Sequence, residues 1–302
     1  MGTPQFAVAS LQKLVEAGCN MVSVVTAPDK PAGRGMQLQQ SDVKAYVLQQ
    51  NLPVLQPEKL KDPIFLEQLK SLEADLFVVV AFRMLPELVW NMPPMGTINL
   101  HGSLLPQYRG AAPIHWAIID GAKETGVTTF RLKHEIDTGN MLLQRVIPIE
   151  ARDTTGSLHD RMMHVGAELL LETLEGLASN MLQEIPQSER IDSKTPLRHA
   201  PKIFTETCRI NWRNPANEID QLVRGMNPYP GAFTTWEDKK LKIWAAEPVE
   251  GTLDGEPGKW HTDQKTYLHI EAGDGLLNIL ELQAEGKKRM PADAFLRGMR
   301  WI

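Results

Sequence analysis

The chain has 302 residues, a formal net charge of −5, and 42% apolar and 23% charged residues, a balance that excludes disordered and collagen-like chains. No apolar run reaches the roughly 20 residues that a membrane span needs, and the opening MGTPQFAVAS lacks the basic region of a signal peptide. Its two cysteines cannot build a disulfide framework, so we expect a reducing, cytoplasmic setting.

The first two thirds of the chain alternate between helix and strand patterns. Helices are expected to begin at a Thr3 cap, at a Ser41 cap and at Asp62-Pro63, and Gly18 should end the first of them. Strands are expected at 21–26, 75–82, 97–101, 126–132 and 141–149, followed by a long helix over 156–178. This alternation predicts an α/β fold with a largely parallel, doubly wound sheet.

The start of this pattern lacks a strand. A doubly wound domain should open with one, yet the first helix begins at Thr3. A missing interior strand would leave two unpaired edges buried, which is costly. We therefore expect an upstream strand that a mis-set start codon has left out.

The pattern changes near Pro186. Residues 186–202 are polar and broken by prolines, which is typical of a linker. Beyond it, one helix pattern at 215–226 stands among short strand-like segments at 208–212, 231–237, 240–249, 267–273 and 275–283. Short strands with turn signals predict a small β-barrel.

Two polar side chains share a face at the end of strand 97–101. Alternate residues of a strand point the same way, so Asn99 and His101 project together while Leu100 enters the core. Open α/β sheets bind ligands at the carboxyl ends of their strands. An amide donor beside an imidazole can form an oxyanion site with a proton-handling group, and the same residues fit a hydrogen-bonded strand end equally well.

Two loops follow that strand. Ser103-Leu104-Leu105-Pro106 either plugs the core or walls a flat ligand, and the local pattern favours the plug. Asp137-Thr138-Gly139 lies between two strands. Its aspartate either caps a turn or, if it comes close to His101, orients the imidazole ring and holds up its pKa.

A third loop, PDKPAGRG at 28–35, carries Lys30 and Arg34 and almost no apolar content. It fits an exposed surface loop, which its composition favours, or a cationic arm that orders on a phosphate-rich partner. The sequence has no GxGxxG after a strand and no GxxxxGK[ST], so a Rossmann dinucleotide site and a P-loop are excluded. His134, Glu135 and Asp137 are a weak candidate metal cluster.

Together these motifs resemble the folate-dependent formyltransferase family. NLHGSLLPQYRGAAPI at 99–114, followed by IDTG at 136–139, is very similar to the family signature. PDKPAGRG, NPYPGAF at 227–233 and LQAEGKKRM at 282–290 resemble the methionyl-tRNA formyltransferase branch. The resemblance covers nearly the whole chain.

The resemblance implies a reaction in translation initiation. The formyl group of 10-formyltetrahydrofolate would move to the α-amine of methionine on initiator tRNA, without a metal. Asn99, His101 and Asp137 take the catalytic positions, and the loop from Ser103 to Pro106 takes the folate-binding position. The residues expected to contact the tRNA are Lys30, Arg34, Lys287, Lys288 and Arg289.

The resemblance also implies a domain arrangement. We expect a Rossmann-like catalytic domain over 1–185, a linker over 186–204 and an OB-like barrel over 205–302, in a cytoplasmic monomer. Residues 1–204 hold 19 basic and 22 acidic side chains and residues 205–302 hold 13 and 15, so affinity for tRNA must come from local cationic clusters.

Two other functions stay open. A sister formyltransferase that acts on an amino-sugar nucleotide would share the Asn99, His101 and Asp137 core. A non-catalytic RNA-binding protein would use the barrel alone, and Asn99, His101 and Asp137 would then have no catalytic role.

Overall fold

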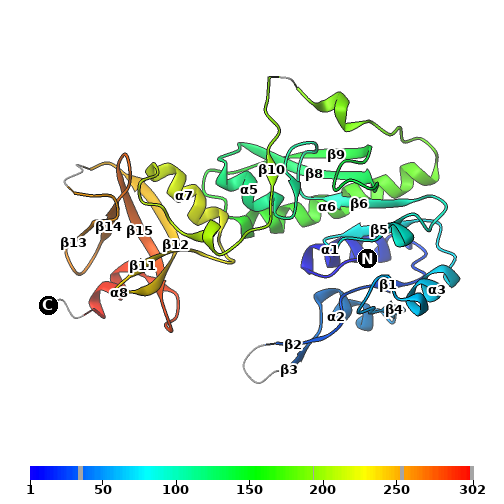
Figure 1. Ribbon diagram of the computed structural model, residues 1–302, viewed down its shortest axis with the longest axis horizontal. Coiled ribbons are helices and arrows are strands. Elements are labelled where there is room, and N and C mark those ends of the chain that lie inside the picture. The colour runs from blue at the N-terminus through cyan, green and yellow to red at the C-terminus, as the bar shows by residue number, and fades with distance from the viewer. Residues whose placement is uncertain (33–36, 193, 252–254, 300–302) are drawn as a thin grey trace. The chain divides into compact units, whose positions relative to one another are not determined.

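The computed structural model describes residues 1–32, 37–192, 194–251 and 255–299, so the predicted arm residue Arg34 lies outside the described residues. The chain divides into two compact units that interleave along the sequence (Figure 1). Unit 1 comprises residues 1–110, 125–147 and 159–199, and unit 2 comprises 111–124, 148–158 and 200–302. The functional domain boundaries expected at 185 and 205 stay a prediction.

The α/β class is confirmed in unit 1. Its helices are α1 (Gln5–Glu16), α2 (Asp42–Gln49), α3 (Pro63–Ser71), α4 (Glu87–Trp90), the greater part of α6 (Thr155–Ala178) and the 3₁₀ turn η1 (Gln187–Arg190). Its strands are β1 (Val24–Val25), β2 (Lys30–Ala32), β3 (Gln37–Gln39), β4 (Val54–Leu55), β5 (Phe77–Val80), β6 (Thr97–His101), β7 (Arg109–Gly110), β8 (Glu124–Arg131) and β9 (Met141–Pro148), with β10 (His199–Ala200) at the division between the units.

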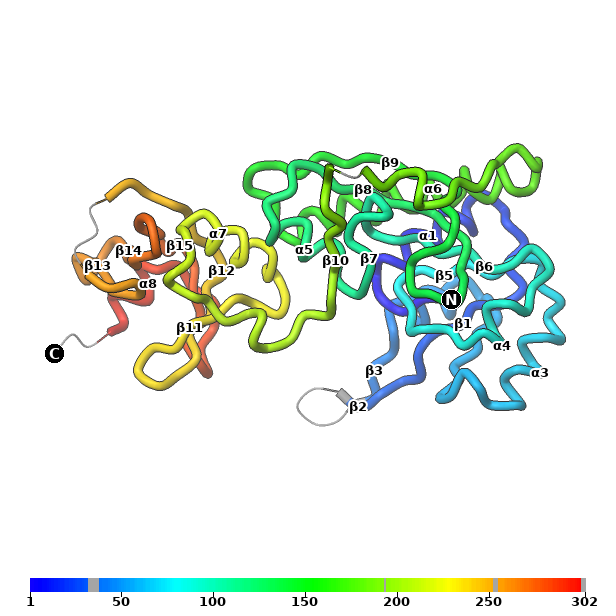
Figure 2. Tube along the Cα trace, turned by 45° about the horizontal axis from the view of Figure 1, so that its top comes forward, coloured from blue at the N-terminus to red at the C-terminus, as the bar shows by residue number. Residues whose placement is uncertain are grey.

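The central sheet of unit 1 has the strand order β5-β6-β8-β9. β5 and β6 run parallel, but β8 runs antiparallel to β6 and places Thr128 opposite His101. β1 and β4 form a separate parallel pair. β2 and β3 pair antiparallel, so residues 30–32 of the expected 28–35 loop form a strand (Figure 2). The expectation of one largely parallel sheet is therefore wrong from β8 onward, because the chain runs back along β6 there.

The first two residues join the parallel pair to the central sheet. The Gly2 amide donates to the Val25 carbonyl (3.1 Å), and the Val80 amide donates to the Met1 carbonyl (2.9 Å). The Met1 ammonium donates to the Val78 carbonyl (2.7 Å), and burial lowers the pKa of this amine to about 5. The expected upstream strand stays a prediction.

Two of the three helix N-caps predicted from the sequence are present. Ser41 and Asp62 accept hydrogen bonds from the amides of Lys44 (3.1 Å) and Ile64 (2.8 Å), which confirms both caps. The Thr3 cap is wrong, because α1 begins at Gln5 after Pro4 and has no side-chain cap.

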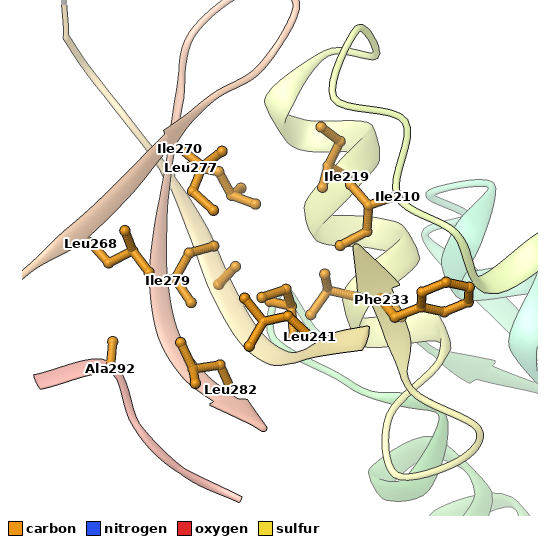
Figure 3. Packing of buried hydrophobic residues seen from close by; sticks show 14 of the residues in the cluster. Ile210, Ile219, Phe233, Leu241, Leu268, Ile270, Leu277, Ile279, Leu282 and Ala292 are labelled. Atoms are coloured by element: carbon orange, nitrogen blue, oxygen red, sulfur yellow. The ribbon is translucent and has the colours of Figure 1, made fainter. Parts of the chain in front are cut away.

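Unit 2 is built on one antiparallel sheet. Its elements are α5 (Pro113–Ile119), η2 (Glu206–Cys208), α7 (Ala216–Gly225), β11 (Ala232–Trp236), β12 (Lys239–Val249), β13 (Trp260–Thr262), β14 (Leu268–Glu271), β15 (Leu276–Ala284), β16 (Met290–Pro291) and α8 (Ala292–Arg297). The strand order is β11-β12-β15-β14-β13, with β16 also on β15, and no pairing among the described strands closes it into a barrel. Apolar side chains from its strands pack with Ile219 of α7 and with Ala292 (Figure 3).

No helix among the described residues is long and apolar enough to cross a membrane.

Candidate active site

The carboxyl end of β6 carries the two side chains that the sequence singled out. His101 is buried, at 7% exposure, and Asn99 is half-buried. Within the described part of the chain, the Asn99 side chain makes no hydrogen bond. A strand end that needed this amide for its own structure would hold it in a hydrogen bond, so the unengaged amide favours the functional interpretation.

The orientation of the His101 ring comes from a backbone carbonyl. Nε2 lies 2.9 Å from the Tyr108 carbonyl oxygen, and because a carbonyl only accepts, Nε2 carries the hydrogen. Nδ1 is then the nitrogen that can take up a proton. Tyr108 adopts a left-handed φ of +56°, and its own amide donates to the Arg198 carbonyl (2.7 Å), so the loop holds the carbonyl in place.

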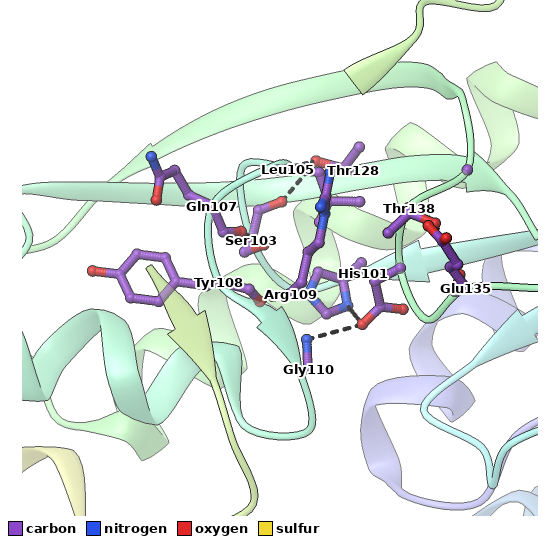
Figure 4. Close-up of polar contacts among 12 residues, drawn as sticks. His101, Ser103, Leu105, Gln107, Tyr108, Arg109, Gly110, Thr128, Glu135 and Thr138 are labelled. Atoms are coloured by element: carbon purple, nitrogen blue, oxygen red, sulfur yellow. Dashed lines mark hydrogen bonds and ion pairs between the residues drawn. The ribbon is translucent and has the colours of Figure 1, made fainter. Parts of the chain in front are cut away.

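Asp137 faces the other side of the ring. Its Oδ2 lies 3.8 Å from His101 Nδ1 and accepts a hydrogen bond from the Gly110 amide (2.9 Å; Figure 4). The expected approach of Asp137 to His101 is confirmed, but the expectation that it orients the ring is wrong, because 3.8 Å is too long for a hydrogen bond. The carboxylate instead provides a negative charge beside Nδ1.

The Ser103 to Pro106 loop is anchored to β8. The buried Ser103 hydroxyl donates to the Gln107 carbonyl (2.6 Å), and the Ser103 carbonyl accepts from the Thr128 hydroxyl (2.7 Å). Leu105 is fully buried against Phe130 and Met141, whereas Leu104 is half-buried. Leu105 thus fills the core, as the plug interpretation predicts, and a folate contact by this loop stays a prediction.

Two residues that the sequence analysis did not predict as site residues, Arg109 and Gln187, lie beside Asp137. Gln187 belongs to the segment expected to be a linker, yet it is 3% exposed and lies against the Asp137 loop. Its side-chain oxygen accepts from Arg109 Nε (2.9 Å) and Nη2 (2.6 Å). Burial lowers the pKa of the Arg109 guanidinium, while the nearby carboxylates of Asp137 and Glu135 act in the opposite direction.

The predicted tRNA contacts lie on the surface where they are described. Lys30 is exposed in β2, and Lys287 and Lys288 are exposed on the turn after β15. Arg289 is also exposed but pairs with the Glu281 carboxylate, which offsets its charge.

Unit 2 has a second basic surface that the sequence did not reveal. Two cavities of about 440 and 500 Å³ share Phe233, Lys240 and Lys242, and together we call them the Phe233 cleft. Lys240 Nζ lies 4.3 Å from the Phe233 ring centre, and the Arg209 guanidinium lies 5.3 Å from it. The alternating Lys-Leu-Lys at 240–242 is the sequence signal that could have indicated it.

The described residues contain no group of three or more His, Cys, Asp or Glu side chains that could hold a metal ion. His134, Glu135 and Asp137 therefore do not gather as the weak candidate cluster required.

Two family models match the chain. Residues 1–174 match the family model described as formyl transferase, and residues 202–300 match the formyl transferase C-terminal domain. A methionyl-tRNA formyltransferase of Parabacteroides distasonis is 54% identical, over 100% of this chain and 95% of that protein. One from Bacteroides fragilis (strain YCH46) is 51% identical, over 99% of this chain and 93% of that protein.

Solved structures with this fold include more distant proteins. The N-formyltransferase from Helicobacter canadensis, in complex with folinic acid and dTDP-3-aminofucose, matches with a TM-score of 0.68 at 18% identity, over 96% of this chain and 97% of that one. HypX from Aquifex aeolicus, in complex with tetrahydrofolic acid, matches with a TM-score of 0.60 at 22% identity, over 83% of this chain and 43% of that one. At such identities the similarity shows the fold alone.

Proposed function

The chain belongs to the formyl transferase family, and we propose that it transfers the formyl group of 10-formyltetrahydrofolate to the α-amino group of methionyl initiator tRNA. Full-length relatives at 45–54% identity are named methionyl-tRNA formyltransferases. The amino-sugar alternative is less supported, since the structure with dTDP-3-aminofucose is only 18% identical. The unengaged Asn99 amide beside His101 and Asp137 is the observation that supports catalysis over RNA binding alone.

The three side chains suit this reaction. When the methionyl amine attacks the formyl carbon, negative charge grows on the formyl oxygen, and the Asn99 amide can donate to it. His101 Nδ1 takes a proton from the attacking amine and returns it to N10 of the folate as the N10–formyl bond breaks. The Asp137 carboxylate, 3.8 Å away, stabilises the imidazolium between these steps.

A direct test compares acceptors. The protein is incubated with 10-formyltetrahydrofolate labelled in the formyl group and with either methionyl initiator tRNA or dTDP-3-aminofucose. We expect label on the methionyl-tRNA and a rate on the amino sugar that is lower by at least 100-fold. Preferential labelling of the amino sugar would overturn the assignment, and labelling of neither would leave the RNA-binding alternative.

We further propose a division of labour in a cytoplasmic monomer. The catalytic site consists of Asn99, His101 and Asp137, and the Ser103 to Pro106 loop contacts folate. The unit 2 sheet binds RNA, as OB-folds do. The tRNA contacts are Lys30, Arg34, Lys287, Lys288 and Arg289, to which we add Lys240 and Lys242 of the Phe233 cleft.

If the Phe233 cleft binds tRNA, replacing its lysines should weaken the use of tRNA and leave the use of folate unchanged. Its lysines contribute positive charge beside aromatic rings, which favours phosphates and stacked bases. We expect Lys240→Glu with Lys242→Glu to raise the KM for tRNA about tenfold or more at low salt, with the KM for folate unchanged. Lys59→Glu with Lys61→Glu, two exposed lysines of unit 1, is the matched control. An equal effect in the control, or no effect in the cleft, would contradict the assignment.

A further inference from the structure

Gln187 has its whole hydrogen-bonding capacity engaged at the active site. Its Nε2 donates to the carbonyls of Asp137 and Gly139, both at 2.8 Å. Its Oε1 accepts the two bonds from Arg109. A glutamine amide offers two donated hydrogens and two accepting lone pairs, so this arrangement admits only one orientation of the amide.

The backbone fixes where Gln187 lies. Two residues earlier, Ile185 exchanges both backbone hydrogen bonds with Met141 (2.8 and 2.9 Å), at the start of β9. Ile185 also packs on the cluster of Leu105, Phe130 and Met141. The polar segment is therefore pinned to the sheet directly beside the loop that carries Asp137.

That loop is held by contacts from outside it. Asp137 adopts a left-handed φ of +53°, which costs backbone free energy for a non-glycine residue. The loop carbonyls on either side of Thr138 point at Gln187, which binds both of them. Arg109 is also held by Gln187, and no ion pair forms between its guanidinium and the Asp137 carboxylate in the described residues.

We propose that Gln187 is a positioning residue for the reaction. It clamps the loop through the carbonyls of Asp137 and Gly139, so that the Asp137 carboxylate faces His101 Nδ1. Through its side-chain oxygen it also holds the Arg109 guanidinium, whose positive charge interacts with the Asp137 carboxylate. This inference rests on the proposed formyl transfer, and it assigns a role to a segment whose sequence is typical of a linker.

Two variants of Gln187 test the clamp. Gln187→Met keeps the length and removes every hydrogen bond, while Gln187→Glu keeps the acceptor for Arg109 and removes both donors. We expect each to lower kcat at least tenfold, with the KM for tRNA and for folate within twofold. Gln183→Met, the same change at an exposed position four residues earlier, is the control and should leave kcat within twofold. Wild-type kcat in Gln187→Glu would overturn the proposal.

A double-mutant cycle with Asp137→Asn separates positioning from a general loss of structure. If Gln187 acts through the Asp137 carboxylate, Gln187→Met should cost less than twofold in the Asp137→Asn background. An equal cost in both backgrounds, or a loss confined to KM, would contradict the role. Failure of the proposed function is distinguishable from failure of this role, because it would show as a wild-type protein that does not formylate methionyl-tRNA. The same cycle is then measured with whichever acceptor the wild type uses.

Discussion

At the scale of single residues, the site brings together two residues with left-handed backbone and side-chain groups that have no hydrogen-bond partner in the described part of the chain. Tyr108 and Asp137 both have left-handed backbone, and the two flank His101 from opposite sides. Tyr108 turns its carbonyl toward Nε2, and Asp137 brings its carboxylate toward Nδ1. The Asn99 side chain beside them makes no hydrogen bond within the described residues. We infer that these two left-handed residues, which cost backbone free energy, hold His101 Nε2 in a hydrogen bond and leave Nδ1 available to take up a proton.

Gly139 tests how tightly the Asp137 loop is packed. A Cβ added to Gly139 would lie 1.6 Å from the Arg131 carbonyl oxygen, so the loop would have to move. We expect Gly139→Ala to lower kcat at least tenfold and to lower the free energy of unfolding by about 2 kcal/mol or more. Gly275→Ala, where nothing lies within 4 Å of an added Cβ, is the control for both kinetics and denaturant unfolding. A fully active Gly139→Ala protein would show that the loop is not held as described.

At the scale of elements, the periodic segments were predictable and the irregular ones were not. The strand expected at 97–101 is β6 with the same bounds, and the helix expected at 156–178 is α6. The β2–β3 pair was missed, because its strands lack apolar alternation and their pairing is between backbones. Gln187 was missed for a related reason, since one glutamine in a polar segment carries no period and is buried only by tertiary contacts.

The α3 cap offers a test of local sequence chemistry. Asp62 accepts a hydrogen bond from the Ile64 amide at 2.8 Å, in an exposed setting. We expect Asp62→Ala to lower the free energy of unfolding by about 1 kcal/mol, and Asp62→Asn, which keeps an accepting oxygen, to change it by less than about 0.5 kcal/mol. Urea denaturation at neutral pH measures both. Equal losses for Ala and Asn would mean that the hydrogen bond does not stabilise the helix.

At the scale of the whole molecule, the charge is spread so that neither half is basic. Some of the described cations lie together locally, at the turn after β15 and in the Phe233 cleft. We expect tRNA that binds there to release counterions, so its binding should weaken steeply with salt even though the net charge is −5. The net charge of the chain is therefore compatible with a nucleic-acid partner that binds at local cationic clusters.

The central claim is that Asn99, His101 and Asp137 catalyse formyl transfer to methionyl-tRNA. The most direct measurement is the single-turnover rate of formyl transfer by Asn99→Ala, at saturating tRNA and folate, beside tRNA affinity and a control at the exposed Asn217→Ala. We predict a rate lower by about 100-fold or more for Asn99→Ala, from loss of the oxyanion donor, with tRNA affinity within twofold. An unchanged rate in Asn99→Ala would contradict the account.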